Sequence, residues 1–417
     1  KVATPAGLEA MVLKRINIKE GDFLFLEWPK LKEEILLTSD RTALFKSSAE
    51  TASIVTVLAS LILQVNKIKS AMDDESKRTP VQPEYDIVVS VLNTRPDMMD
   101  VKWDVKLAAE MYIGPFLDKI SLMSNYTLKT QWRYEAHFEF PMQQIIDDSP
   151  IGRHYAMAEN VFPHMITAIE KKLGNGISNN PVIHLIIYIP SCHISPLRVY
   201  KSNGEKASNE KIESFISPNW GSVIIYNPPV NLCAKYNEDQ KKITFDIISK
   251  DVMQIILFHI GKLLDIHSDH IVSGNHGITI TDIEQIGPRV WEYDAFLRRA
   301  TVNYITTVTR TLQSLIQLLA DIKYILINDD VGEAINQAHE NIVKAKEFLA
   351  KNELLKASEF ARMAYVSSEK AFFDASLLEQ LYFPDEQKYA VYIPLFLPIM
   401  VPVVLSLAMI KKYYLNR

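Results

Sequence analysis

The segment Ser191-Cys192-His193 places a thiol beside an imidazole, and a cysteine–histidine pair is the basis of thiol-protease chemistry. Neighbouring residues of an extended segment point to opposite sides, however, and no motif nearby indicates an oxyanion hole. A disulfide with Cys233, the only other cysteine, agrees better with an oxidising compartment, and two buried free thiols are the other interpretation. In the chain-entropy model, closing a loop of about 40 residues would contribute roughly 3–4 kcal/mol.

A second group of potential ligands lies in the stretch DIHSDHIVSGNH. Its imidazoles and carboxylates belong to Asp265, His267, Asp269, His270 and His276. Such side chains can bind zinc, but the stretch has no HxH or HExxH pattern, and a polar loop after an apolar helix explains it better. The sequence therefore predicts no metal site. The alternative function for the whole chain is an enzyme. It would be a lumenal hydrolase using Cys192 and His193, or a metal-dependent enzyme using the His267–His276 cluster.

Three pairs of acidic residues could in principle perform acid–base catalysis: Asp147-Asp148, Asp329-Asp330 and Asp385-Glu386. All three lie at predicted turns or helix starts, where helix capping and solvation explain them better. The sequence contains no GxGxxG, Walker or GxSxG motif. We therefore expect a non-catalytic protein that needs no cofactor.

The composition is that of a folded protein of two or three domains. The chain has 417 residues, of which 48% are hydrophobic and 23% charged, and its net charge is −5. This charge, with no long basic run that includes aromatic residues, argues against nucleic acid as a partner.

The elements that must position these groups alternate between helix and strand over residues 1–270. The predicted helices are Ser48–Ile68, Asp104–Met123 with an interruption near Gly114-Pro115, Val161–Leu173 and Val252–Ile266. The predicted strands are Phe23–Leu26, Asp86–Leu92, Tyr126–Phe140, Val182–Ile189, Ser222–Tyr226 and Ile243–Ile248. We expect an α/β or α+β domain in this part of the chain.

Residues 271–385 are predicted to be helical. From about Trp291 onward, apolar residues recur every three or four positions in three successive stripes, and short turns separate them near Asn328 and Asn352. Short turns make successive helices antiparallel neighbours, so we expect a helical stalk.

The segment from Ala390 to Ile410 contains no charged residue. At about 1.5 Å per residue a helix of this length spans roughly 30 Å, the thickness of the hydrocarbon core of a bilayer, so residues 390–410 are predicted to cross a membrane. Pro394, Pro398 and Pro402 lie close to one helical face. Each leaves a carbonyl four residues earlier without its N–H partner, and lipid cannot replace that partner. We expect this face to pack against other protein.

The charges that flank the span predict its orientation. Lys411, Lys412 and Arg417 lie in the tail of residues 411–417, which the positive-inside rule places in the cytoplasm. The bulk of the chain would then be lumenal, where the sequon at Asn125 can be glycosylated.

The sequence also contains residues that match a known family. In chain order they are Tyr85, Ser90, Leu92 and Asn93; Val101, Trp103 and Asp104; Pro115, Phe116 and Leu117; Ser217, Pro218, Trp220, Gly221, Tyr226 and Asn227; and Asp329, Asp330 and Val331. A longer block comprises Ala371 to Asp374, Ser376 to Leu378, Leu381 to Asp385, Gln387-Lys388 and Ile393 to Pro398. From about residue 20 to the end, this pattern resembles the PIG-S family, the class S subunits of glycosylphosphatidylinositol (GPI) transamidase.

The resemblance implies a membrane protein of the endoplasmic reticulum with two spans, the first of which would precede residue 1. It implies membership of the complex that joins GPI anchors to proproteins, with PIG-K, PIG-T, PIG-U and the GPI anchor attachment subunit as partners. The catalytic residues of that complex belong to the caspase-like PIG-K, so the resemblance implies an accessory role. It also implies glycosylation at Asn125.

Overall fold

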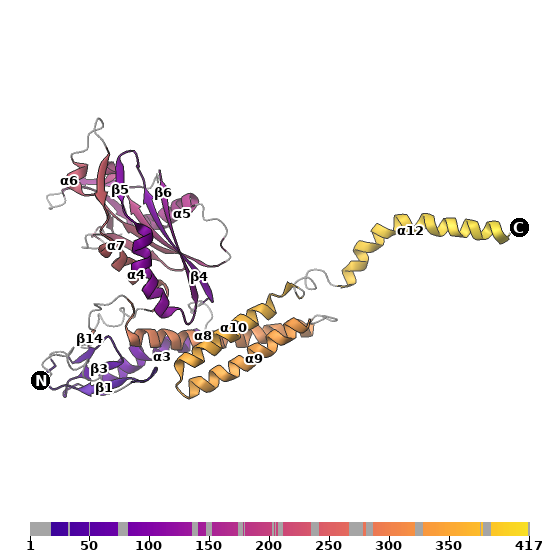
Figure 1. Ribbon diagram of the computed structural model, residues 1–417, viewed down its shortest axis with the longest axis horizontal. Helices are drawn as coiled ribbons and strands as arrows, with labels where there is room; N and C mark the ends of the chain where they lie inside the picture. The colour runs from indigo at the N-terminus through magenta and orange to yellow at the C-terminus, as the bar shows by residue number, and fades with distance from the viewer. Residues whose placement is uncertain are drawn as a thin grey trace. The chain divides into compact units, whose positions relative to one another are not determined.

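The computed structural model describes residues 18–31, 34–49, 51–73, 82–135, 141–146, 152–173, 178, 180–201, 204, 206, 212–234, 242–266, 278–280, 287–321, 328–375, 377 and 385–415 (Figure 1). The chain divides into two compact units. One comprises Lys1–Asn303 with Asn352–Ser358, and the other comprises Tyr304–Lys351 with Glu359–Arg417.

The first unit contains a five-stranded sheet in the order β11-β12-β9-β4-β6. Its strands are β4 (Glu84–Asn93), β6 (Asn125–Tyr134), β9 (Val182–Ile189), β11 (Glu213–Ser217) and β12 (Gly221–Ile225). Neighbouring strands are parallel from β6 to β12, and β11 is antiparallel to β12. The strands predicted at residues 86–92, 182–189 and 222–226 are confirmed. Their near-continuous β-branched runs are typical of strands buried on both faces.

Helices cover both faces of this sheet. Helices α4 (Val105–Ile120) and α7 (Ser249–Leu263) pack together on one face, where α4 lies against β6 and α7 against β12 (Figure 1). Helix α5 (Phe162–Leu173) places Met165 and Ile169 in a core cluster with Leu92 of β4 on the other face. The unit is therefore a three-layer α/β arrangement, and the predicted mixed α/β fold class is confirmed.

Helix α4 is not interrupted near Gly114-Pro115, so that part of its prediction is wrong. Pro115 lies inside a continuous helix that Asp104 caps by accepting a hydrogen bond from the N–H of Leu107. The proline removes the partner of the Met111 carbonyl, and Met111 is 59% exposed, so water can bind that carbonyl instead.

The helix predicted from Ser48 to Ile68 is broken, which also corrects the prediction. The structure has α2 (Thr51–Val57), a π-helical turn (Leu58–Ile62) and, after a break at Gln64 with φ +51°, α3 (Val65–Asp73). Arg298 donates to the carbonyl of Ile62, and Arg299 donates to the side chain of Gln64. The first bond occupies a backbone carbonyl at the break, and the second holds the side chain of the residue where the helix breaks.

The strand predicted from Tyr126 to Phe140 ends at Tyr134, because Glu135 has φ +56° and leaves the extended conformation. Residues 136–140 lie outside the described part of the chain.

The described residues of the first unit also form three smaller sheets. They have the orders β1-β3-β2-β14, β10-β8-β7 and β13-β5. Their strands are β1 (Leu24–Glu27), β2 (Ile35–Leu37), β3 (Thr42–Phe45), β5 (Met99–Lys102), β7 (Gln143–Ile146), β8 (Arg153–Ala158), β10 (Leu197–Tyr200), β13 (Ile243–Asp246) and β14 (Ile278–Ile280). Most are three or four residues long, so periodicity could not reveal them all.

Three long helices follow: α8 (Val290–Asp321), α9 (Asp329–Ala350) and α10 (Leu354–Phe372). Asn328 caps α9 through its side chain. In the second unit, Ala361 and Ala364 of α10 are fully buried, and small residues allow helix backbones to approach closely. The predicted helical C-terminal region is confirmed.

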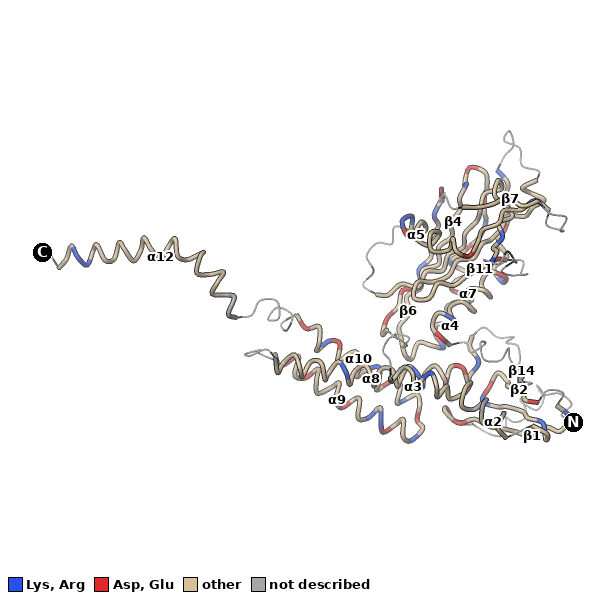
Figure 2. The backbone as a smooth tube through the Cα atoms, turned by 180° about the vertical axis from the view of Figure 1, so that it is seen from behind, with Lys and Arg blue, Asp and Glu red and all other residues tan. Residues whose placement is uncertain are grey.

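The last helix, α12 (Asp385–Leu415), is apolar and long enough to cross a membrane between Tyr389 and Leu415. Along the coloured part of α12, Figure 2 shows charge only near the C-terminal end. Lys411 and Lys412 lie in that part of the sequence. The helix contains Pro394, Pro398 and Pro402 and bends in its first half (Figure 1). Proline is a common cause of such a bend.

Candidate functional site

The carboxyl edge of the five-stranded sheet is where an α/β fold normally binds a ligand. From β4 the chain crosses first to β6 on one side and then to β9 on the other, so the strand order reverses between β4 and β9. In open α/β sheets, ligands bind in the crevice outside the carboxyl ends of the strands at such a point.

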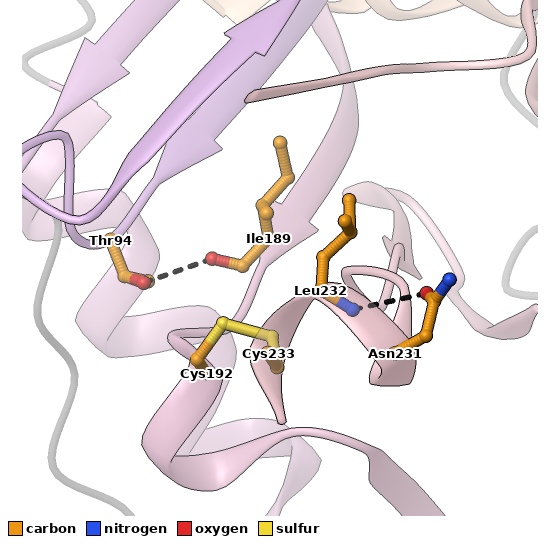
Figure 3. Close-up of a disulfide and its surroundings, with 6 residues drawn as sticks. All are labelled: Thr94, Ile189, Cys192, Asn231, Leu232 and Cys233. Atoms are coloured by element: carbon orange, nitrogen blue, oxygen red, sulfur yellow. Dashed lines mark hydrogen bonds between the residues drawn. A yellow bond between two sulfur atoms is a disulfide. The ribbon is translucent and has the colours of Figure 1, made fainter. Parts of the chain in front are cut away.

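In this chain, the protein's own bonds occupy that edge (Figure 3). Thr94, directly after β4, donates from Oγ1 to the carbonyl of Ile189 at 3.0 Å. Asn93 donates to the carbonyl of Met99 at 3.2 Å. Both side chains are buried, and a disulfide lies near Thr94 and Ile189 (Figure 3). At this edge, the side chains of Asn93 and Thr94 are thus engaged by hydrogen bonds within the chain, and a covalent link joins two of the segments that follow the strands.

That disulfide joins Cys192 and Cys233, whose Cα atoms are 5.2 Å apart. Cys192 lies in a 3₁₀ turn after β9, and Cys233 ends the short helix α6 (Val230–Cys233) after β12. Because β9 and β12 are parallel neighbours, their carboxyl ends meet at one edge of the sheet. In this state Cys192 has no thiol that His193 could activate.

Most of the histidine cluster lies outside the described part of the chain. His267, Asp269, His270 and His276 lie outside the described residues. Asp265 is described, and its carboxylate lies 2.9 Å from Lys67 and 3.1 Å from Arg299. Two cations thus compensate this carboxylate. Among the residues that the structure describes, no group of three His, Cys, Asp or Glu side chains could hold a metal ion.

The structure brings together one serine–histidine pair that the sequence analysis missed. Ser214 Oγ of β11 lies 3.3 Å from His259 Nε2 of α7. Burial lowers the pKa of His259 to about 4, so its imidazole is neutral at physiological pH. Its Nδ1 has no hydrogen-bond partner among the described residues, and the residue is 3% exposed. Without an orienting carboxylate or access for a substrate, the pair lacks the features of a catalytic triad.

A cavity of about 180 Å³ lies at the opposite, amino edge of the sheet. Its lining residues are Gln82, Tyr85, Ser124, Tyr126, Pro181, Val182, Ile183, Asn219, Trp220, Leu263, Leu264 and Phe296. None of them is a carboxylate, histidine, lysine or cysteine. Burial raises the pKa of Tyr85, which therefore stays protonated at physiological pH. The cavity can hold an apolar group but offers no general acid–base pair.

Asn125 is the first residue of β6 and is exposed. Its backbone N–H donates to the carbonyl of Pro83 at 2.8 Å, which starts the ladder with β4. The side chain is thus at the surface while the backbone is fixed.

The family model "Phosphatidylinositol-glycan biosynthesis class S protein" matches residues 10–417. "GPI-anchor transamidase component PIGS" of Mus musculus is 34% identical over 337 residues, which cover 80% of this chain and 58% of the mouse protein. The Homo sapiens protein of the same name is also 34% identical, with the same coverage.

A fungal relative, "GPI transamidase component PIG-S homolog" of Schizosaccharomyces pombe, is 25% identical over 324 residues. These cover 77% of this chain and 53% of the fungal protein. The chain thus spans somewhat more than half the length of these relatives. Because the family match extends over nearly the whole sequence, the chain belongs to the PIG-S family, the phosphatidylinositol-glycan biosynthesis class S proteins.

Proposed function

We propose that this chain acts as a subunit of GPI transamidase, the complex that attaches GPI anchors to proproteins. The observation that carries the proposal is that the mouse relative, 34% identical over 80% of this chain, is named a GPI-anchor transamidase component. Relatives with the same role in their names occur in mammals and in a fission yeast.

The proposed role is structural rather than catalytic. In support of it, Cys192 is held in a disulfide, the cavity at the amino edge has no titratable acid–base pair, and the Ser214–His259 pair is buried. The chemistry of the complex would then reside in the caspase-like partner PIG-K. PIG-T, PIG-U and the GPI anchor attachment subunit are the other proposed partners.

We place the protein in the membrane of the endoplasmic reticulum, with the bulk of the chain lumenal and the C-terminus cytoplasmic. Lys411 and Lys412 follow the apolar part of α12, and the positive-inside rule favours the cytoplasm for such residues. The Cys192–Cys233 disulfide agrees with an oxidising lumen, since disulfides are rare in the cytosol.

Two parts of the chain would support assembly: the α/β unit through its surface, and α12 through its proline face. Pro394, Pro398 and Pro402 leave the carbonyls of Ala390, Pro394 and Pro398 without helical partners. In lipid these carbonyls need donors from protein, and a neighbouring helix can supply them.

The test is the set of membrane proteins that co-purify with the full-length, epitope-tagged protein in mild detergent, identified by mass spectrometry. We expect PIG-K, PIG-T, PIG-U and the GPI anchor attachment subunit to be recovered in comparable amounts. An unrelated tagged membrane protein with one C-terminal span is the control for detergent carry-over. Recovery of an intact complex without a caspase-like subunit would refute the proposal.

A further inference from the structure

The outer edge of β6 is the long edge of the central sheet. Strand β6 has ten residues, and β4 is its only partner strand in the described part of the chain. The other end of the sheet, β11, has half that length.

The register shows which backbone groups of β6 face away from β4. Asn125 pairs with Glu84 and donates its N–H toward the β4 side, to the carbonyl of Pro83. In a parallel ladder, alternate residues of a strand bond to the same neighbour, so the odd-numbered residues of β6 bond to β4. The backbone N–H and C=O groups of the even-numbered residues therefore point outward: Tyr126, Leu128, Thr130, Trp132 and Tyr134. Within the described residues, the last four have no backbone partner.

The usual protection of an edge strand is missing at these outward positions. Proteins block such edges with proline, bulges or charges that extend beyond the edge. The five outward residues are aliphatic, β-branched or aromatic. The two cations of β6 are held over the sheet instead: Lys129 forms an ion pair with Asp86 of β4, and Arg133 donates to the carbonyl of Leu173 at the end of α5.

From this geometry we propose that the outer edge of β6 pairs with an extended strand of another subunit, which continues the sheet across the subunit boundary. The inference rests on the proposed membership of a complex. A ten-residue strand, with outward N–H and C=O groups and no blocking residue, is a template for strand addition, and a stable protein must cover it. A permanent subunit can provide that cover, whereas a transient peptide leaves the edge exposed between encounters.

The two faces of β6 define the side chains that the incoming strand should carry. Leu128, Trp132 and Tyr134 lie on the face that α4 covers, and Tyr134 is 59% exposed and stacked on Trp132. The opposite face carries Lys129 and Arg133. Since cross-strand neighbours interact as pairs, the incoming strand should alternate apolar residues with polar or acidic ones.

The test compares two substitutions at Thr130 in the full-length, tagged protein. Thr130→Pro removes the outward N–H but no bond to β4, because proline is tolerated in edge strands where the N–H faces outward. Thr130→Val keeps that donor and the β-branched shape, and it is the matched control. We expect Thr130→Pro to lower the recovery of the subunit that supplies the strand by about tenfold, and Thr130→Val to leave it unchanged.

A second measurement keeps the inference falsifiable should Thr130→Pro impair folding. A photoreactive phenylalanine analogue in place of the exposed Tyr134 should crosslink to one extended segment of another subunit, identified by mass spectrometry. Equal recovery of subunits by the unsubstituted protein, Thr130→Pro and Thr130→Val would overturn the inference while leaving the proposed function intact. A crosslink to a second copy of this chain, or no crosslink, would also overturn it. Absence of all subunits from the unsubstituted protein would instead refute the proposed function.

Discussion

Cys192 and Cys233 lie 41 residues apart in the sequence, and the loop that they close contains β10, β11 and β12. Cross-linking a loop of this size lowers the entropy of the unfolded chain and contributes about 4 kcal/mol in the chain-entropy model. The bond holds the segments after two parallel strands together, at the edge where other α/β proteins bind their ligands. At the scale of single residues, the site is therefore built for stability.

We predict that replacing both cysteines by alanine lowers the thermal unfolding midpoint of the purified protein but preserves its function in cells. The loss of unfolding free energy should be about 2–4 kcal/mol, because the loop is no longer constrained. Surface display of a GPI-anchored reporter measures function. The control is Cys233→Ala alone, which removes the disulfide but keeps the side chain of Cys192. Loss of anchoring in a complex that still contains every subunit would contradict the non-catalytic role.

Residue types alone could not decide between a disulfide and two free thiols. The missing information was the strand order: both cysteines follow predicted strands, and only the parallel pairing of β9 with β12 brings the two ends together. Ser214 and His259 are 45 residues apart and show no spacing pattern, so no sequence signal indicates their contact.

At the scale of elements, α12 combines two requirements that oppose each other. Its side chains from Tyr389 to Leu415 are apolar enough for lipid, yet its three prolines expose backbone carbonyls. An unsatisfied carbonyl in hydrocarbon costs several kcal/mol, so the helix is best accommodated beside a protein that donates hydrogen bonds.

We predict that replacing Pro394, Pro398 and Pro402 together by leucine reduces recovery of PIG-T and PIG-K roughly tenfold, because hydrogen bonds between helices are lost. The measurement is quantitative co-purification in mild detergent. A control with the same spacing, in which Leu395→Ile, Ile399→Leu and Val403→Leu are combined, should leave recovery unchanged. Unchanged recovery in the proline-free protein would count strongly against a docking role for this face.

Local pattern predicted the existence of elements better than their boundaries or their partners. The apolar runs of β4, β9 and β12 and the stripes of α9 and α10 were predicted correctly, because both patterns depend on near neighbours. The break at Gln64 and the open edge of β6 were not predicted. The first involves bonds from Arg298 and Arg299 of α8, and the second depends on which strands pair.

At the scale of the whole molecule, the span assigns each part of the chain to a compartment. In the proposed topology the C-terminus is cytoplasmic, so the first unit and the part of the second unit before α12 would lie in the lumen, together with the disulfide and the sequon. We predict that an epitope placed after Arg417 reacts with antibody when only the plasma membrane is permeabilised, because the positive-inside rule retains Lys411 and Lys412 in the cytoplasm. An epitope replacing part of residues 74–81 should stay protected, and the reverse pattern would invert the topology.

The same orientation predicts one N-linked glycan. Endoglycosidase treatment should increase the electrophoretic mobility of the protein, and Asn125→Gln should reproduce that mobility without treatment. Asn125→Gln should leave complex recovery unchanged, because the Asn125 side chain is exposed and only its backbone joins the ladder. A shift that persists in Asn125→Gln would place the glycan elsewhere.

The position of Asn125 in the β4–β6 ladder also sets an order in time. Once the two strands pair, the backbone of Asn125 to Thr127 is extended and fixed by the register that begins at Glu84. A glycan acceptor is normally presented on a surface loop, and this segment is loop-like only before the sheet forms. Pairing β4 with β6 brings together segments that α4 separates in the sequence, and such non-local contacts form slowly. We therefore expect transfer of the predicted glycan to precede closure of the sheet, and chains that fold first to remain unmodified for their lifetime.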